Sequence, residues 1–499
     1  MARHRVPVQA LRNFISILMG FAIGGLNNLV VLPWVFGDDR STWGLVTFSA
    51  AWAATLAPIL AFGSPPSMNR FRGRCEREGT LAQLYGSLAQ PGVVLFSLFI
   101  VLPALLFPET SADILGLQGE KRSVVRPIAL LTGLQTCQVY FISFLSSNLK
   151  TSLATFTQET LFKIGYLALV TAVGYGIVSR PQFLPGFICL YALVLSILFA
   201  QAMANGFKID LRGIRDRNLL RELRWYSGTM ILGSSASIII SQIDIIMVGR
   251  LMSLEWVPLF AIASFIAAVV QIPKRAVGRL WYPLIASAMD KVDVTEAFRI
   301  VKLNHQTVLL TSGWILACIC ACLPELNALL HEDFRGLNTV ILTVGCLRII
   351  EGSASGSLMI LGQSKHYSWL IALNWGMVFI AIPLNLFFIP ESGLGLGLWG
   401  AAMATLVARG TSILCRQWVI WHIWRRFTPS AHSLGIILCL GAPACLLTMW
   451  TPDTHALLSL LLKSVAITLW TAGAAHWLKM APEATAFALK SLARSGGDH

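Results

Sequence analysis

Seven charged side chains lie within stretches of the sequence that are otherwise almost entirely apolar. They are Glu159, Lys163, Asp244, Arg348, Glu351, Arg409 and Lys463. A charged side chain at the centre of a membrane helix costs roughly 2.5–3.5 kcal/mol on insertion scales, so such residues usually face a cavity or a partner. A guanidinium keeps its charge at depth and can hold a phosphate or carboxylate through two parallel hydrogen bonds. These residue types therefore favour the binding of an anionic or polar ligand within a membrane.

Two pairs among these charges are spaced so that they could neutralise each other on one helix. Glu159 and Lys163 stand four residues apart, and Arg348 and Glu351 stand three apart. Side chains at these spacings are neighbours on a helix surface. Local ion pairing is therefore the structural alternative to ligand binding for Lys163 and Arg348, and both interpretations stay open at this point.

Arg409 and Asp244 differ, because no oppositely charged residue stands three or four positions from either of them in the sequence. Arg409 is accordingly the strongest candidate for a cation that binds substrate, with Lys163 and Arg348 as lesser candidates. The alternative is that Arg409 offsets a buried acid such as Asp244, since an unpaired buried charge is strongly destabilising. Lys463 is interpreted as structural, because it either extends its ammonium group toward the membrane surface or serves the two added C-terminal helices.

The elements that must position these side chains are membrane-spanning helices. About fourteen apolar runs follow one another, each long enough to cross the ~30 Å hydrocarbon layer as a helix. Hydrophobic residues make up 56% of the sequence and charged residues 12%, whereas soluble domains carry roughly a quarter charged residues. Only helices and closed barrels satisfy their own backbone hydrogen bonds in lipid, so the sequence predicts an all-α integral membrane protein. The helices are expected near 11–34, 42–63, 81–107, 124–147, 154–178, 183–206, 225–248, 254–273, 303–330, 338–362, 367–389, 394–420, 432–450 and 455–478.

Lysine and arginine gather in every second connection between these helices. The basic segments are the N-terminus with Arg3 and Arg5, residues 70–77, 208–224 and 274–302, the pair Arg425–Arg426, and the C-terminal tail. The positive-inside rule predicts that these segments, and therefore both termini, are cytoplasmic. The connection 108–123 departs from the pattern because it also carries basic residues. The net charge of +14 thus reflects membrane topology and does not indicate a nucleic-acid partner.

The long basic segment separates two parts that share a weak internal similarity. Gly37 to Trp43, after helix one, and Gly249 to Trp256, after helix seven, differ in length by one residue. Transporters often contain two repeats with the substrate site between them, so we expect two six-helix lobes around a central cavity plus two C-terminal helices. The predicted domains are an N-terminal lobe over 1–207, a basic cytoplasmic linker over 208–224, a C-terminal lobe over 225–426, and helices thirteen and fourteen with a cytoplasmic tail over 427–499.

Helices one and seven each carry a stripe of small and polar residues, since residues three and four apart share a helix face. The stripes are Asn13, Ser16, Gly20, Gly24 and Asn27 in helix one, and Ser227, Ser234, Ser237, Ser241 and Asp244 in helix seven. Close packing of helices explains the glycines and serines. It explains Asn27, Asn28, Gln242 and Asp244 less well, so these four residues are predicted to line the cavity.

Three segments of the sequence resemble a known family. They are GGLNNLVVLPWVFGDDRSTWGLVTFSAAWAATLAPILAFGSPPSMNRF, LGQSKHYSWLIALNW and LNLFFIPESGLGLGLWGAAMATLVARG. Together with the helix count, they resemble polysaccharide flippases of the multidrug/oligosaccharidyl-lipid/polysaccharide exporter superfamily over most of the first twelve helices. The first extracellular loop departs from the family pattern at Asp38, Asp39 and Arg40, to which the sequence assigns no role.

The resemblance implies a transporter of the bacterial inner membrane that flips a lipid-linked oligosaccharide of the undecaprenyl-pyrophosphate type for surface or exopolysaccharide assembly. Arg409 would bind the pyrophosphate, and the polar stripes would bind the sugar. Expected partners are the lipid-linked glycan, membrane lipids, and polysaccharide polymerase or export machinery. The alternative is a cation-coupled multidrug exporter of the same superfamily, which would need a carboxylate in the first lobe; helix one has none within its span.

Enzymatic and cofactor chemistry is not indicated by the sequence. The loops are short and carry no His-rich cluster. The ten cysteines lack metal-binding spacing and are interpreted as small, reduced hydrophobic residues. No phosphate-binding loop of the GxxxxGK[ST] type is present, which argues against ATP as the energy source. We therefore expect no enzymatic activity, no metal and no cofactor.

The topology can be tested by labelling single cysteines in a chain from which the ten native ones have been removed. A cysteine at Ser392 or Thr454 should react with a membrane-impermeant maleimide added to intact cells. One at Arg217 should react only after permeabilisation, because strongly basic loops stay inside. The reverse labelling pattern would reject the predicted topology.

Overall fold

The computed structural model describes residues 2–115, 117, 122, 124–148, 150–290, 293–329, 336–427, 432–450 and 455–477. They form helices joined by short connections, which confirms the predicted all-α membrane fold. The chain divides into two compact units, Met1–Pro258 and Leu259–His499. The four-part division expected from the sequence stays a prediction. The loops at 330–335 and 451–454 and the tail beyond residue 477 lie outside the described residues.

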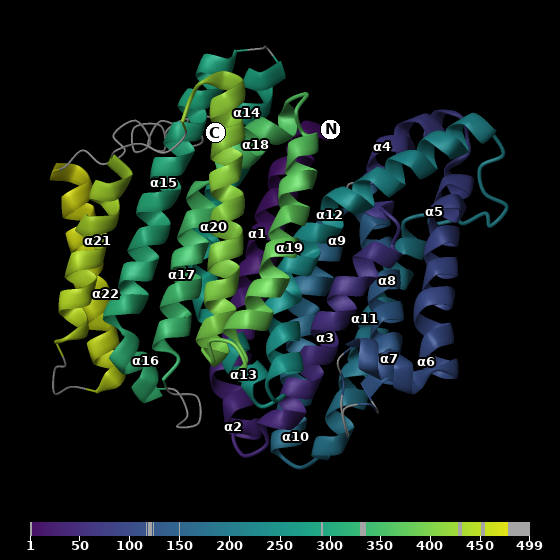
Figure 1. The fold of residues 1–499 in the computed structure, drawn as a ribbon. Coiled ribbons are helices and arrows are strands. Elements are labelled where there is room, and N and C mark those ends of the chain that lie inside the picture. Colours follow the sequence, from purple (N-terminus) through teal and green to yellow (C-terminus); the bar gives the residue numbers. More distant parts are fainter. Residues whose placement is uncertain are drawn as a thin grey trace. The chain divides into compact units, whose positions relative to one another are not determined.

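The helices of the first unit run mostly along a common direction (Figure 1). They are α1 (Ala2–Leu26), η1 (Asn27–Val31), α2 (Leu32–Phe36), α3 (Arg40–Leu60), α4 (Ser64–Arg77), α5 (Leu81–Phe96), η2 (Ser97–Val101), α6 (Leu102–Leu106), α7 (Pro108–Leu115), α8 (Val125–Ser147), α9 (Thr151–Thr155), η4 (Phe156–Leu161), α10 (Phe162–Gly174), η5 (Arg180–Gln182), α11 (Phe183–Ala204) and α12 (Arg217–Leu251). Within this unit α3 packs against α8 and α12, and α8 packs against α11.

The second unit has α15 at its centre, packed against α14, α17, α21 and α22. Its helices are α13 (Trp256–Ala268, which begins in the first unit), η6 (Val269–Gln271), α14 (Ile272–Asp290), α15 (Val294–Ala321), α16 (Leu323–Leu329), α17 (Asn338–Ser353), α18 (Ser355–Gln363), α19 (Ser368–Phe388), α20 (Gly397–Trp424), α21 (His432–Thr448) and α22 (Ala456–Trp477). α20 in turn packs against α17 and α19, so α17 lies between α15 and α20.

The number of spans is compatible with the sequence prediction. Ten helical segments of the described chain are long and apolar enough to cross a membrane, or twelve if two bent helix pairs each form one span. The bent pairs are α15 with α16, at 60°, and α17 with α18, at 41°. The other two predicted spans, 154–178 and 432–450, correspond to α9–η4–α10 and α21. Each of the fourteen predicted apolar runs thus corresponds to one or more helices, and the ends of several predicted runs lie in turns, as at 175–178.

Two membrane helices of the first unit widen into a π-helical turn just before a proline. η1 precedes Pro33, and η2 precedes Pro103. Proline has no N–H to donate, and its ring crowds the preceding turn of an α-helix. A π turn adds one residue to the helical turn, and this spacing lets the chain continue through each proline without ending the helix.

Glycines set the closest helix contacts of the first unit. A Cβ on Gly20 of α1 would lie 2.0 Å from the carbonyl oxygen of Glu159 in η4. A Cβ on Gly44 of α3 would lie 1.9 Å from the carbonyl oxygen of Leu254. Only residues without a side chain allow backbones to approach this closely. Gly20 in the helix-one stripe therefore serves helix packing.

Asp39, which had no assigned role, caps the N-terminus of α3. Its carboxylate accepts hydrogen bonds from the backbone N–H of Thr42 (3.2 Å) and from the hydroxyls of Thr42 (2.7 Å) and Ser41 (2.8 Å). Partial burial disfavours the charged carboxylate, but these hydrogen bonds and nearby Arg180 outweigh it and hold the pKa of Asp39 below its usual value. The stabilisation is complete above the usual carboxyl pKa and is lost as the pH falls through the lowered value.

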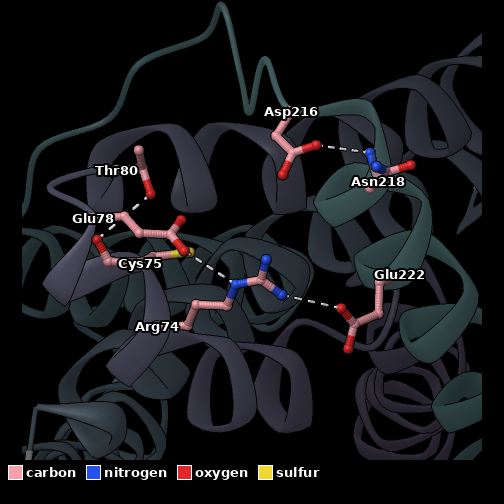
Figure 2. Close-up of polar contacts among 7 residues, drawn as sticks. All are labelled: Arg74, Cys75, Glu78, Thr80, Asp216, Asn218 and Glu222. Atoms are coloured by element: carbon pink, nitrogen blue, oxygen red, sulfur yellow. Dashed lines mark hydrogen bonds and ion pairs between the residues drawn. The ribbon is translucent and has the colours of Figure 1, made fainter.

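Polar contacts bind the start of α12 to α4, and Figure 2 shows them. Arg74 of α4 donates to Glu78 at 3.1 Å and to Glu222 of α12 at 3.3 Å. The side chain of Asp216 accepts from the backbone N–H of Asn218 at 2.9 Å and so caps α12. Part of the charge in the basic segments is thus neutralised by acids on the same surface.

A buried contact and a cation–π contact strengthen the junction of α4 and α12. The hydroxyls of Ser67 and Ser227 lie 2.7 Å apart and are buried. The guanidinium of Arg70 lies 4.3 Å from the centre of the Tyr226 ring. Exposed ion pairs contribute only about 0–1 kcal/mol, so these two contacts are needed to fix α12 on α4.

A fully buried ion pair joins α22 to α16 within the second unit. Nζ of Lys463 in α22 lies 2.6 Å from Oε1 of Glu325 in α16, and the two side chains are 0% and 6% exposed. The hydroxyl of Ser459 donates to the same oxygen at 2.6 Å. Lys463 is therefore structural, as the sequence predicted. It pairs with an acid at the bend between α15 and α16, and its side chain is fully buried against that acid.

Removing one partner of this buried pair should destabilise the protein. Lys463→Met leaves the Glu325 carboxylate buried without its cation, and we expect a loss of about 3–5 kcal/mol. The double variant Lys463→Met/Glu325→Gln should recover most of it. Thermal unfolding of the purified protein in detergent measures both. Glu296→Gln, which breaks an exposed pair with Arg299, is the control and should change the melting temperature little. A double variant as unstable as the single one would contradict the pairing.

Candidate functional site

The span formed by α17 and α18 is broken at Ser353, Ala354 and Ser355, where the two helices meet at 41°. A break frees backbone carbonyls, and inside a membrane each freed group needs a partner from the protein. Nδ1 of His305 in α15 lies 3.1 Å from the Ser353 carbonyl oxygen and donates to it, because a carbonyl can only accept. Nη2 of Arg416 in α20 donates to the Ala354 carbonyl at 3.4 Å. Side chains from the two flanking helices thus complete the broken span.

Arg416 is the least exposed of the arginines around this break, with 9% of its surface accessible. Its Nε donates to the hydroxyl of Ser357 at 3.1 Å. Ser357 itself donates to the Ala354 carbonyl at 2.6 Å. On the opposite flank, Nδ2 of Asn304 donates to the hydroxyl of Ser355 at 3.2 Å. Arg416 therefore brings a positive charge next to the break, where it donates to the neutral oxygens of Ser357 and Ala354.

Glu351, two residues before the break, is the acid around which the other charges gather. It accepts from Nη1 of Arg409 in α20 and from Nη1 of Arg348 at 3.1 Å, one guanidinium on each carboxylate oxygen. Nε2 of Gln271 also donates to it, at 3.1 Å. The side chains of Arg348, Glu351 and Arg409 are 22%, 15% and 12% exposed. The group is thus largely buried, yet it remains in partial contact with the accessible surface.

A fourth cation lies within the same group of charges. The side chain of Lys274 in α14 comes within 3.8 Å of the position that a Cβ on Gly352 would occupy, one residue after Glu351. It is close enough to interact electrostatically with Glu351 and with the three arginines. We call Lys274, Arg348, Glu351, Arg409 and Arg416 the α17 charge cluster.

The α17 charge cluster contains four cations and a single carboxylate. Helices α17, α18 and α20 carry no acid besides Glu351 in the part of the chain that the structure describes. Charges interact strongly where little water screens them, and an uncompensated buried charge is costly. The cluster keeps an excess of positive charge even if Lys274 gives up its proton. This arrangement suits the binding of an anion.

Arg409 pairs with Glu351, an acid 58 residues away in the sequence that the spacing of the charges did not mark as its partner. The alternative in which Arg409 offsets Asp244 stays a prediction. Arg348 pairs with Glu351 as its spacing predicted, but it also joins the cluster. Lys163 lies in the first unit, where its Nζ is 2.9 Å from Glu159, which is the local ion pair considered as the alternative.

The polar residues predicted to line a cavity belong to two helices of the first unit. Asn27 is 2% exposed and lies in the π turn η1, and its Oδ1 has no hydrogen-bond partner among the described residues. Asn28 donates to the carbonyl of Gly24 at 2.8 Å. Gln242 and Asp244 are partly exposed on α12. Their role as cavity residues stays a prediction.

Sequence reasoning missed Arg416, Lys274 and Gln271 as parts of a site. Arg416 follows Arg409 by seven residues, which places both on one face of a helix after two turns. That spacing was the available signal. Lys274 and Gln271 flank the η6–α14 junction, and the sequence marked Lys274 only as part of a basic connection.

Arg416 should be needed for the stability of the broken span. Arg416→Met removes the donor to the Ala354 carbonyl and to Ser357, and losing a hydrogen bond from a charged group costs about 1.5–3 kcal/mol. The melting temperature in detergent should fall accordingly. Arg416→Gln keeps some hydrogen-bond donors, so its melting temperature should fall less. The control is Arg426→Met at the exposed end of α20, which should have little effect. An unchanged melting temperature for Arg416→Met would contradict its role at the break.

No protein-family model matches the sequence, and no curated protein matches it. Several solved structures, however, have a similar fold. An inward-facing multidrug resistance MATE family transporter of the MOP superfamily aligns with a TM-score of 0.61 and 13% identity, covering 83% of this chain and 99% of that chain. A MATE transporter in the bent conformation aligns with a TM-score of 0.53 and 16% identity, covering 84% of this chain and 96% of that chain.

A third similar structure is the Vibrio cholerae MATE transporter VcmN in the bent form, at a TM-score of 0.53 and 13% identity over 84% of this chain and 97% of that chain. The likeness extends over nearly the full length of the solved chains. At these identities it establishes the architecture and not the substrate. The chain has the fold of MATE transporters of the MOP superfamily.

Proposed function

We propose that this chain is a membrane transporter that works by alternating access and carries an anionic amphiphile. In its finer form, the proposal is a flippase for a lipid-linked oligosaccharide of the undecaprenyl-pyrophosphate type, acting in the bacterial inner membrane for surface or exopolysaccharide assembly. The single observation that carries the anionic substrate is the excess of cations over acid in the α17 charge cluster.

The position of the cluster supports a transport role. Discontinuous membrane helices commonly form substrate and ion sites in transporters, because irregular backbone is tolerated only where it is covered by protein or lines a polar space. Here the broken span α17–α18 brings Arg348 and Glu351 together with Arg409 and Arg416 from α20. A guanidinium matches the planar pair of oxygens on a phosphate and keeps its charge at depth.

The remaining parts of the proposed substrate would meet other parts of the protein. The sugar would bind polar side chains such as Asn27, Asn28, Gln242 and Asp244 on α1–η1 and α12. Lys163 is a weaker candidate for the headgroup, because Glu159 already neutralises it. Membrane lipids, and polysaccharide polymerase or export machinery, are the proposed partners, and both termini are proposed to be cytoplasmic.

A cation-coupled multidrug exporter is the second candidate, and the fold comparison supports it better than it supports a flippase. One of the similar solved structures is described as a multidrug resistance MATE family transporter. Helix one has no acid within its own span, which disfavours this function. However, the backbone of Glu159 contacts α1 at Gly20, and the side chain of Glu159 is 43% exposed. The first unit therefore does place an acid beside helix one.

Two assays separate these candidates. Depletion of the protein in its native cells should cause a lipid-linked glycan to accumulate on the cytoplasmic side if it is a flippase. Expression in cells that lack drug exporters should leave resistance to cationic drugs unchanged. Increased resistance, together with no accumulated glycan, would reject the flippase in favour of the second candidate.

Arg409 variants test the headgroup site in reconstituted vesicles. Arg409→Ala should reduce flipping of a lipid-linked pyrophosphate glycan by about tenfold or more, since charged hydrogen bonds contribute about 1.5–3 kcal/mol. Arg409→Lys should keep part of the activity, because a point charge replaces the planar fork. Arg299→Gln, an exposed arginine of the same unit, is the control. Full activity of Arg409→Ala would show that this arginine does not bind the headgroup.

A further inference from the structure

Glu351 occupies the position that an anionic ligand would need. The two arginines that could best grip a phosphate, Arg348 and Arg409, each donate to one oxygen of its carboxylate. Gln271 donates to the same carboxylate at 3.1 Å. A two-oxygen anion held by two guanidinium groups is also the arrangement in which phosphate is recognised in proteins.

We propose that Glu351 is an internal counter-anion that a phosphate-bearing ligand displaces from Arg409 and Arg348. This inference rests on the proposed transport of an anionic substrate. It describes the same site without ligand, when the Glu351 carboxylate pairs with both arginines. The ligand class is a phosphate or pyrophosphate group, which either a cargo headgroup or a bulk lipid headgroup could supply.

The charges of the cluster make the exchange favourable. Glu351 contributes one negative charge, which leaves the cations of the cluster in excess. A pyrophosphate carries more than one negative charge and more acceptor oxygens, so it compensates the cluster more completely than a single carboxylate does. Arg416 and Lys274 lie close enough to interact with Glu351 and would add to the attraction.

The same carboxylate also provides a way to release the ligand. Glu351 is tethered to the chain, and its effective concentration at Arg348 and Arg409 is high, so it competes with the ligand at all times. A site of four cations without such a competitor would hold a pyrophosphate too long for rapid transport. Since Glu351 lies two residues before Ser353, its movement in and out of the arginine pair would also act next to the bend of the span.

The test is the affinity for inorganic pyrophosphate of the full chain, purified in detergent and measured by calorimetry. Wild type should bind, and Glu351→Gln should bind at least tenfold more tightly, because the amide keeps the shape and the Gln271 contact but no longer competes for the arginines. Arg409→Gln should lose most of the binding. Pyrophosphate binding by Glu351→Gln that is unchanged or weaker than wild type would overturn the proposal, as would the absence of binding in both.

The control and a second variant keep the result interpretable. Glu296→Gln makes the same chemical change in the same unit at an exposed pair with Arg299, and its affinity should equal that of wild type. If Glu351→Gln does not fold, Glu351→Asp takes its place. The shorter side chain keeps the charge but reaches the arginines less well, so its affinity should rise by a smaller factor, and a fall would overturn the proposal.

Lipid composition distinguishes the two sources of phosphate. The same titration is done in nanodiscs of phosphatidylcholine, with and without phosphatidylglycerol. If bulk lipid headgroups compete for the arginines, the pyrophosphate affinity is weaker when the anionic lipid is present. It shows no difference if the site takes only a cargo headgroup. Tighter binding by Glu351→Gln without any glycan flipping would support the exchange and reject the flippase. Failure of the exchange proposal and failure of the flippase proposal can therefore be told apart.

Discussion

The main constraint on this molecule is that no backbone polar group can be left unpaired inside the membrane. Where a span runs unbroken, the helix meets this requirement by itself. At Ser353–Ser355 it cannot, and the neighbouring helices supply His305 and Arg416 to the freed carbonyls. Arg416 brings a full positive charge into a region of low polarity. The charge cluster at the break is thus connected to a backbone requirement as well as to ligand chemistry.

Three sets of intramembrane charges among the described residues differ in balance, and the difference guides how we interpret them. Glu159 with Lys163, and Glu325 with Lys463, are one-to-one pairs, the first partly exposed and the second fully buried. Such pairs carry no net charge and need nothing further. The α17 charge cluster combines four cations with Glu351 alone, and this inequality is the basis on which we propose it as a binding site.

The sequence predicted the helices well because a long apolar run leaves the chain few alternatives in lipid. It also offered the local pair of Glu159 and Lys163 as the alternative to ligand binding, since four-residue spacing is decided within one helix. It did not identify Glu351 as the partner of Arg409, because 58 residues separate them and only packing of α17 on α20 brings them together. The break at Ala354 was missed for a similar reason: no proline marks it, and its stability comes from side chains on α15 and α20.

The buried pair of Lys463 and Glu325 has a consequence for how the protein is made. The segment that becomes α22 leaves the ribosome long after α16 and must enter the bilayer with a lysine in its middle. Entry into pure lipid would carry the insertion penalty of a central lysine. When α16 is already in place, its Glu325 carboxylate can pair with Lys463 as α22 enters, which offsets this penalty. Integration of α22 is thus favoured when α16 is already correctly placed, so the order of synthesis links the entry of α22 to the assembly of the earlier helices of the second unit.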